Sequence, residues 1–142
     1  MTAVTSASAT TDRRRIRLAA AAAAVVTLCA GLGVRAVADG DVAKYAGDVL
    51  YTVLLCTLVV LVAPAAVTRW TAAAVGLGLS WAIELFQLTG VPAELSQHSV
   101  VARLILGSTF NAPDLFWYAV GAGLFLLICT VAPRPSGLRD AS

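Results

Sequence analysis

The chain has 142 residues, of which 59% are hydrophobic and only 13% are charged. Soluble domains carry roughly 25% charged residues, so the composition excludes an ordinary soluble domain. The formal net charge of +2 does not indicate a nucleic-acid-binding protein, because most of the basic residues flank apolar runs, where they act as topology signals.

Four apolar runs predict the fold. They cover residues 18–34, 49–67, 70–89 and 115–132, and each is close to the ~20 residues that cross a hydrocarbon core of ~30 Å. We therefore expect an all-α membrane protein, with a bundle of four transmembrane helices forming one domain over residues 16–132. Residues 1–15 are expected to be a disordered basic tail and residues 133–142 a disordered cytoplasmic tail.

The first apolar run has two interpretations. The basic residues 13–17, the run itself and the sequence Ala36-Val37-Ala38 together resemble a cleavable signal peptide. The run is longer than the usual apolar region of such a peptide, and Arg35 interrupts the approach to the cleavage site, which favours a retained first helix. N-terminal sequencing of the membrane-extracted protein separates the two interpretations.

The distribution of basic residues predicts the orientation of the bundle. With both termini in the cytoplasm, the inner side holds seven basic residues and the outer side three, as the positive-inside rule requires. The inner residues are Arg13, Arg14, Arg15, Arg17, Arg69, Arg134 and Arg139, and the outer ones are Arg35, Lys44 and Arg103. We expect a multi-pass protein of the inner (plasma) membrane with both termini inside the cell.

The third apolar run carries two polar residues, Glu84 and Gln87, within its span. A carboxylate at that depth costs on the order of 2.5–3.5 kcal/mol, so it faces a protein interior or a water-filled cavity. Gly76 and Ser80 precede Glu84 at intervals of four and share its face, and small residues at this spacing allow helices to approach closely. The glutamate is therefore predicted to point at a neighbouring helix.

The segment 90–112 is predicted to form a short helix in the outer membrane interface. Pro92 suits the first turn of this helix, Gly107 suits its end, and Arg103 would be held against the bundle. Asn111 and Asp114 then mark the start of the fourth transmembrane helix.

The strong polar groups of the spans all fall at the outer end of the predicted bundle. The candidate site consists of Asp48, Glu84, Gln87, Arg103, Asp114 and Tyr118, with Lys44, Tyr51 and Arg35 as secondary members. Several of these residues also suit purely structural roles: Asp48 and Asp114 suit the first turn of a helix, the aromatic residues suit an interfacial belt, and Arg103 suits a counter-ion of Glu84 or Asp114. No spacing typical of metal ligands occurs, and we expect neither a metal nor a cofactor.

The order of these motifs resembles a known family. The motifs are Lys44-Tyr45-Ala46-Gly47-Asp48-Val49-Leu50-Tyr51, Glu84-x-x-Gln87, Arg103-x-x-x-Gly107-x-x-Phe110 and Asp114-x-x-x-Tyr118-x-x-Gly121. Over residues 32–127 they resemble the small bacterial membrane family catalogued as domain of unknown function 2809, and their order is similar to that of VanZ-like proteins. Tyr118 stands where the VanZ-like pattern has asparagine, and the histidine common after the helix-two aspartate is missing. The resemblance implies an architecture and a residue set but no reaction.

Three hypotheses of function follow. In the first, the site binds a lipid-linked or other anionic cell-envelope headgroup, with Arg103 and Lys44 or Arg35 meeting phosphate, Gln87 and Tyr118 donating hydrogen bonds, and the carboxylates orienting the arginine. In the second, the protein is a non-catalytic scaffold whose polar cluster fixes helix packing. In the third, it is an intramembrane enzyme with Glu84 as acid or base. The absence of a nucleophile with a base at a suitable spacing favours a role other than catalysis. The lipid bilayer is the expected partner, a homodimer is left open, and no nucleic acid is expected.

Overall fold

The computed structural model describes residues 2–64 and 67–132, and within these ranges every regular element is a helix. The elements are α1 (Thr2–Val37), α2 (Gly40–Val62), α3 (Arg69–Phe86), the 3-10 turn η1 (Gln87–Thr89), α4 (Val91–His98), α5 (Val100–Leu106) and α6 (Ala112–Val131). Four segments of this part of the chain are long and apolar enough to cross a membrane: Ala9–Val37, Gly40–Val62, Arg69–Thr89 and Ala112–Val131. The all-α class and the four membrane-spanning helices are thus confirmed, and the protein has the build of a multi-pass membrane protein.

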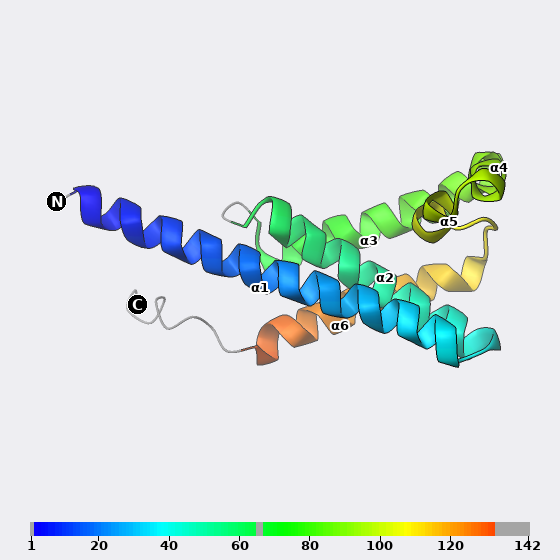
Figure 1. Ribbon diagram of the computed structural model, residues 1–142, viewed down its shortest axis with the longest axis horizontal. Helices are drawn as coiled ribbons and strands as arrows, with labels where there is room; N and C mark the ends of the chain where they lie inside the picture. The colour runs from blue at the N-terminus through cyan, green and yellow to red at the C-terminus, as the bar shows by residue number, and fades with distance from the viewer. Residues whose placement is uncertain (1, 65–66, 133–142) are drawn as a thin grey trace.

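The helices run back and forth, so their ends gather at two ends of the bundle (Figure 1). The short helices α4 and α5 lie at one end, together with the connection between α1 and α2 and the first turn of α6. The N-terminal part of α1, the end of α2 and the start of α3 lie toward the other end. We refer below to the first of these as the α4–α5 end.

Helix α2 is the centre of the bundle, because it packs against α1, α3 and α6, while α3 and α6 also pack against each other. The hydrophobic core lies among α2, α3 and α6 and is formed by Val53, Cys56, Ala72, Ala73 and Phe125. Helix α1 packs mainly against α2, and over residues 9–37, where its burial is described, its buried hydrophobic residues are Ala20 and Ala24. The first span therefore lies along one side of a tightly packed three-helix unit.

Glycines bring α2 into close contact with both of its neighbours in that unit. A Cβ atom on Gly76 of α3 would lie 2.8 Å from the backbone nitrogen of Cys56, and one on Gly121 of α6 would lie 2.5 Å from the carbonyl oxygen of Val49. Between these crossings, the hydroxyls of Thr52 and Ser80 are 2.9 Å apart and fully buried. The prediction that the small-residue face of the third span points at a neighbouring helix is confirmed.

The structure changes two expectations, one for the N-terminal tail and one for the segment between the third and fourth spans. The predicted disordered tail of residues 1–15 belongs largely to α1, which begins at Thr2. No glycine or proline interrupts residues 1–30, so the helix continues N-terminally from the apolar run, adding one hydrogen bond per residue. The tail predicted at residues 133–142 lies outside the described part of the chain.

The predicted single helix between the third and fourth spans is two helices, α4 and α5, which meet at Ser99. Ser99 has extended backbone angles (φ −145°, ψ 120°), and its hydroxyl accepts a hydrogen bond from the backbone of Ala102 at 3.2 Å. Serine favours such a capping conformation over a helix interior, which accounts for the break. Pro92 lies in the first turn of α4 and Gly107 ends α5 with a φ of 67°, as predicted.

Candidate functional site

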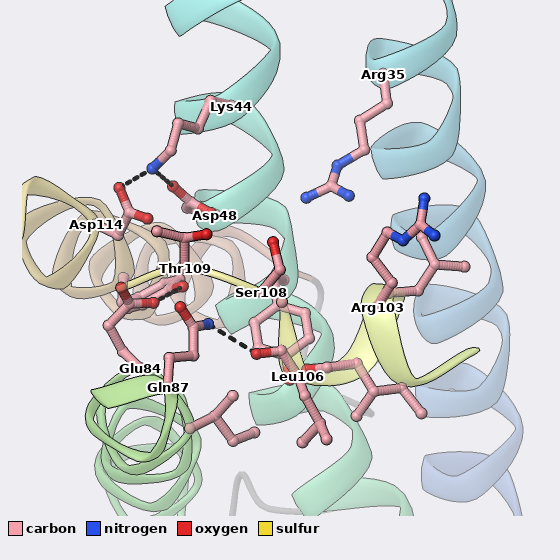
Figure 2. A pocket seen from close by; sticks show the side chains of 16 residues that line it. Arg35, Lys44, Asp48, Glu84, Gln87, Arg103, Leu106, Ser108, Thr109 and Asp114 are labelled. Atoms are coloured by element: carbon pink, nitrogen blue, oxygen red, sulfur yellow. Dashed lines mark hydrogen bonds and ion pairs between the residues drawn. The ribbon is translucent and has the colours of Figure 1, made fainter. Parts of the chain in front are cut away.

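A polar cavity of about 330 Å³ lies at the α4–α5 end, and all nine residues of the predicted site line it (Figure 2). They come from four spans and from α5: Arg35, Lys44, Asp48, Tyr51, Glu84, Gln87, Arg103, Asp114 and Tyr118. Side chains separated by up to 83 positions, from 35 to 118, therefore meet in one place. That this cavity binds a ligand stays a prediction.

Glu84 is hydrogen-bonded to groups of the α6 region and forms no ion pair within the described residues. Its side chain is only 1% exposed, and one carboxylate oxygen accepts a hydrogen bond from the backbone nitrogen of Asn111 at 2.6 Å. The other oxygen accepts from the hydroxyl of Tyr118 at 2.9 Å. Asn111 is the residue that caps α6, and a negative charge is favourable at the start of a helix because the helix dipole is positive there. The α6 terminus thus stabilises the carboxylate within the span.

Lys44 of α2 is the counter-ion of the acidic cluster. Its ammonium group forms an ion pair with Asp114 of α6 and lies 3.9 Å from Asp48, one helical turn away on its own helix. The side-chain amide of Asn111 also donates to Asp114. Asn111 therefore joins Asp114 and Glu84 in one network that ties α2, α3 and α6 together. The sequence identified Asn111 only as the start of a helix, and this capping position was the signal that could have found it.

Gln87 connects the end of the third span to the loop above it. Its side-chain nitrogen donates to the carbonyl oxygen of Leu106 at 2.7 Å. Gly107 has a positive φ of 67°, which favours glycine, and a Cβ atom there would lie 2.5 Å from that nitrogen and displace the Gln87 amide. Ser96 of α4, which the sequence analysis did not single out, donates to the carbonyl oxygen of Gly107 at 2.8 Å. These bonds hold the end of α5 over the cavity.

The two arginines of the site have no carboxylate partner among the described residues. Arg103 donates to the backbone oxygen of Ser96, at 3.1 Å from its terminal nitrogen, and is therefore not the counter-ion of Glu84 or Asp114. Arg35 reaches the cavity from α1, and its guanidinium lies 3.3 Å from the position of a Cβ on Gly47. Figure 2 shows both guanidinium groups on the α1 side of the cavity, across from Lys44 and Asp114.

The polar groups of the cavity are therefore separated by charge. Glu84 and Asp114, with Lys44 as counter-ion, are engaged in hydrogen bonds on the α6 side, and the unpaired guanidinium groups lie on the α1 side. Two further oxygens, Oδ2 of Asp48 and Oε1 of Gln87, are buried and accept no hydrogen bond.

Two of the predicted residue roles differ in the structure. Tyr118, expected to donate to a ligand, donates to Glu84, and the carboxylates do not orient Arg103. The hydroxyl of Tyr51 donates to the carbonyl oxygen of Ile105 at 2.7 Å and so positions α5.

The described part of the chain holds no group of three or more His, Cys, Asp or Glu side chains that is arranged to bind a metal ion. Acidic groups in the cavity instead make hydrogen bonds or ion pairs within the protein. The chemistry available is electrostatic attraction by two guanidinium groups together with acceptance of hydrogen bonds by Asp48 and Gln87.

In a comparison with known proteins, the middle of the chain matches one protein family. Residues 37–122 match the family described as Protein of unknown function (DUF2809). The match begins at the last residue of α1 and ends within α6, so it covers all of the site residues except Arg35. No curated protein and no solved structure matches the chain. Because the match spans more than half of its length, the chain belongs to the DUF2809 family.

Proposed function

We propose that this membrane protein binds an anionic headgroup in the polar cavity, with Arg35 and Arg103 as the groups that meet the negative charge. The observation that carries the proposal is the pair of guanidinium groups, from α1 and α5, that line one cavity without a carboxylate partner in the described residues. Guanidinium matches phosphate in geometry and forms charge-assisted hydrogen bonds with it. Lys44, which the sequence also suggested for this role, is neutralised by Asp114.

Two buried oxygens that accept no hydrogen bond, Oδ2 of Asp48 and Oε1 of Gln87, add a second requirement for the ligand. Buried acceptors without a hydrogen bond are costly, the ammonium group of Lys44 lies 3.9 Å from the Asp48 oxygen, and both residues line the same cavity as the arginines. A headgroup that carries hydroxyl or amine donors beside its phosphate would satisfy both acceptors and the guanidinium groups. Lipid-linked and cell-envelope headgroups have this combination of groups, and the resemblance to VanZ-like proteins favours the same class.

The proposal includes an orientation. With both termini in the cytoplasm, the cavity opens toward the outer leaflet of the inner (plasma) membrane, and α4 and α5 lie in the outer interface. Support comes from the N-terminal part of α1 and the start of α3, which lie at the end of the bundle away from the cavity (Figure 1). These segments hold the basic residues Arg13, Arg14, Arg15, Arg17 and Arg69. Exposed apolar residues of α5, among them Val100 and Val101, suit a helix lying in the interface.

Lipid binding to the purified protein tests this function. Native mass spectrometry in detergent would compare dioleoylphosphatidylglycerol with dioleoylphosphatidylcholine for the wild type, Arg103→Gln and Arg35→Gln. We expect a preference for the anionic lipid and a loss of about tenfold in its affinity in either variant, the magnitude typical of a hydrogen bond to a charged group. Arg17→Gln is the matched control, because Arg17 is exposed on α1 and does not line the polar cavity. Equal affinities in the wild type and both variants would reject the proposal.

A non-catalytic scaffold is the second candidate, and the network from Lys44 through Asp114 and Asn111 to Glu84 favours it, because these bonds join three spans without a ligand. Under this hypothesis the Arg103→Gln and Arg35→Gln variants keep their lipid profile, and only the network residues matter, through stability. The intramembrane-enzyme hypothesis is the remaining alternative, and a Glu84→Gln variant that keeps its full cellular phenotype would remove it.

A further inference from the structure

A second cavity, of about 280 Å³, lies beside the polar one and has a different character. It is formed between α1 and α2 and is walled by aliphatic side chains and glycine, among them Leu28, Gly31 and Leu32 of α1 and Leu50 and Leu54 of α2. Gly31 faces Leu50 across this space, since a Cβ atom on Gly31 would lie 3.9 Å from the Cβ of Leu50. In a protein whose helices span the bilayer, such a space accommodates hydrocarbon rather than water.

The two cavities share one wall. Arg35, Tyr51, Leu104 and Ile105 line both of them. The shared residues come from α1, α2 and α5, and the hydrogen bond from Tyr51 to the backbone of Ile105 fixes α5 against α2 at this junction. Neither cavity is enclosed, and the two are adjacent, because the same four side chains line both of them. Arg35 therefore stands where a charged group in the polar cavity would pass into a hydrocarbon chain.

We infer that the ligand of the polar cavity is an amphiphile, whose anionic headgroup lies between Arg35 and Arg103 and one of whose hydrocarbon chains lies in the apolar cavity between α1 and α2. The inference rests on the proposed function and adds the class of ligand, a membrane lipid rather than a soluble phosphate compound. The four lining residues that the two cavities have in common, and the change from charged to aliphatic side chains at Arg35, carry it. The ligand would enter sideways from the bilayer, along the side of the bundle where α1 packs.

Helix α1 contributes little to the hydrophobic core, but in this proposal it forms part of the ligand site. The hydrophobic core cluster of the described residues comes from α2, α3 and α6, and α1 adds only the small buried side chains of Ala20 and Ala24 over residues 9–37. Yet α1 supplies Arg35 to the polar cavity and Leu28, Gly31 and Leu32 to the apolar one. Its contribution is one wall of the lipid site.

The first test fills the apolar cavity while leaving the polar one intact. Gly31→Leu places a side chain into the space opposite Leu50, and Gly33→Leu is the matched control on the same helix. Gly33 is exposed, lines neither the polar nor the apolar cavity, and has nothing within 4 Å of the position of its Cβ. We expect dioleoylphosphatidylglycerol to bind Gly31→Leu at least about tenfold more weakly than the wild type, a loss equivalent to about two buried methylene groups. Gly33→Leu should bind the lipid as tightly as the wild type does. Glycerol 3-phosphate, which has a phosphate and hydroxyls but no acyl chains, should bind to the wild type at least about tenfold more weakly than the lipid does.

The outcomes separate this inference from the proposed function. If Arg103→Gln weakens binding but Gly31→Leu and Gly33→Leu both bind as the wild type does, the headgroup site stands and the chain site is wrong. The same conclusion follows if glycerol 3-phosphate binds as tightly as the lipid. If Arg103→Gln and Arg35→Gln bind as the wild type does, the proposed function fails and the inference fails with it.

A second measurement uses the wild-type protein, so that it holds even if Gly31→Leu fails to fold. Phosphatidylglycerol with a diazirine in one acyl chain is photo-crosslinked to the protein in detergent with a hundredfold excess of phosphatidylcholine, which dilutes the lipid around the protein surface. We expect crosslinks to persist on the segments 28–32 and 50–54. Crosslinks that fall evenly over all four spans, or that vanish with the excess lipid, would overturn the inference.

Discussion

At the scale of single residues, the decisive feature is how a carboxylate is accommodated inside a span. Glu84 is 1% exposed and accepts hydrogen bonds from two uncharged groups of the α6 region, the backbone of Asn111 and the hydroxyl of Tyr118. Leaving one of these donors unpaired in a buried site costs roughly 1–3 kcal/mol. The network around Glu84 thus stabilises the fold whether or not a ligand binds beside it.

Replacing Glu84 tests this directly. We expect Glu84→Gln to lower the free energy of unfolding by roughly 1–3 kcal/mol, because the amide nitrogen faces one of the two donors. Tyr118→Phe should cost less, near the ~0.6 kcal/mol average of hydrogen bonds in membrane proteins. The double variant should be less destabilised than the sum of the two, as expected for groups in contact. Thermal unfolding in detergent measures all three.

Tyr45→Phe is the control for the tyrosine change. The ring of Tyr45 stacks on Trp117 at a centroid distance of 5.1 Å, and its hydroxyl has no hydrogen-bond partner among the described residues. Its removal should leave the melting temperature unchanged. Strict additivity of Glu84→Gln and Tyr118→Phe would show that the two groups do not share a hydrogen bond.

At the scale of elements, the packing of α2 between α3 and α6 depends on two glycines. We expect Gly76→Ala and Gly121→Ala each to destabilise the protein by about 1–3 kcal/mol, because the added methyl group meets backbone atoms of α2 that cannot move aside without shifting a helix. Melting temperatures in detergent report the effect.

Gly78→Ala and Gly123→Ala on the same two helices are the controls, since nothing lies within 4 Å of either added Cβ. These changes should be neutral or slightly stabilising, as alanine favours the helix. Equal melting temperatures for all four variants would show that the close crossings are not needed.

At the scale of the whole molecule, the long helices place the basic residues at two ends of the bundle. The N-terminal part of α1 and the start of α3 hold Arg13, Arg14, Arg15, Arg17 and Arg69, and the α4–α5 end holds Arg35, Lys44 and Arg103. The excess at the first end predicts that this end faces the cytoplasm. The three cysteines of the chain, Cys29, Cys56 and Cys129, all lie within spans, so they give a low background for thiol labelling from water.

Cysteine labelling in intact cells tests the orientation. We expect a membrane-impermeant maleimide to label His98→Cys, at the end of α4, and not Ser6→Cys, which precedes the first span, because in the predicted orientation only the former faces outward. Permeabilised cells should label both variants, and the wild type gives the background. Labelling of Ser6→Cys alone in intact cells would reverse the predicted topology and place the polar cavity on the cytoplasmic side.

Much of the candidate site follows from the sequence because depth in a membrane follows from position along a span. Once four apolar runs alternate in direction, residues near the end of one span and the start of the next lie at the same end of the bundle, which is why Asp48, Glu84 and Asp114 line one cavity. The close approach at Gly76 was likewise predictable, since small residues recur every four positions on one helix face.

The pairing of charges could not be predicted in this way. The sequence pattern set Arg103 against the carboxylates, yet Lys44 pairs with Asp114, and Arg103 binds the backbone of Ser96. Such pairings depend on how each helix is rotated about its axis and where it crosses its neighbours, and spacing along one helix carries no information on either. The break between α4 and α5 depends similarly on the competition between a capping serine and helix continuation at Ser99.

The sequence by itself thus determined the helical class, the four spans, the end of the bundle at which the polar residues gather, and the family, because hydropathy and motif order are properties of the chain taken in line. Only the tertiary structure decided that α6 receives Glu84, that Lys44 neutralises the acids, and that Arg35 and Arg103 are left together at the junction of a polar and an apolar cavity. The physical reason is that a charge is stabilised by whichever group lies within a few ångströms of it, and those neighbours come from other helices.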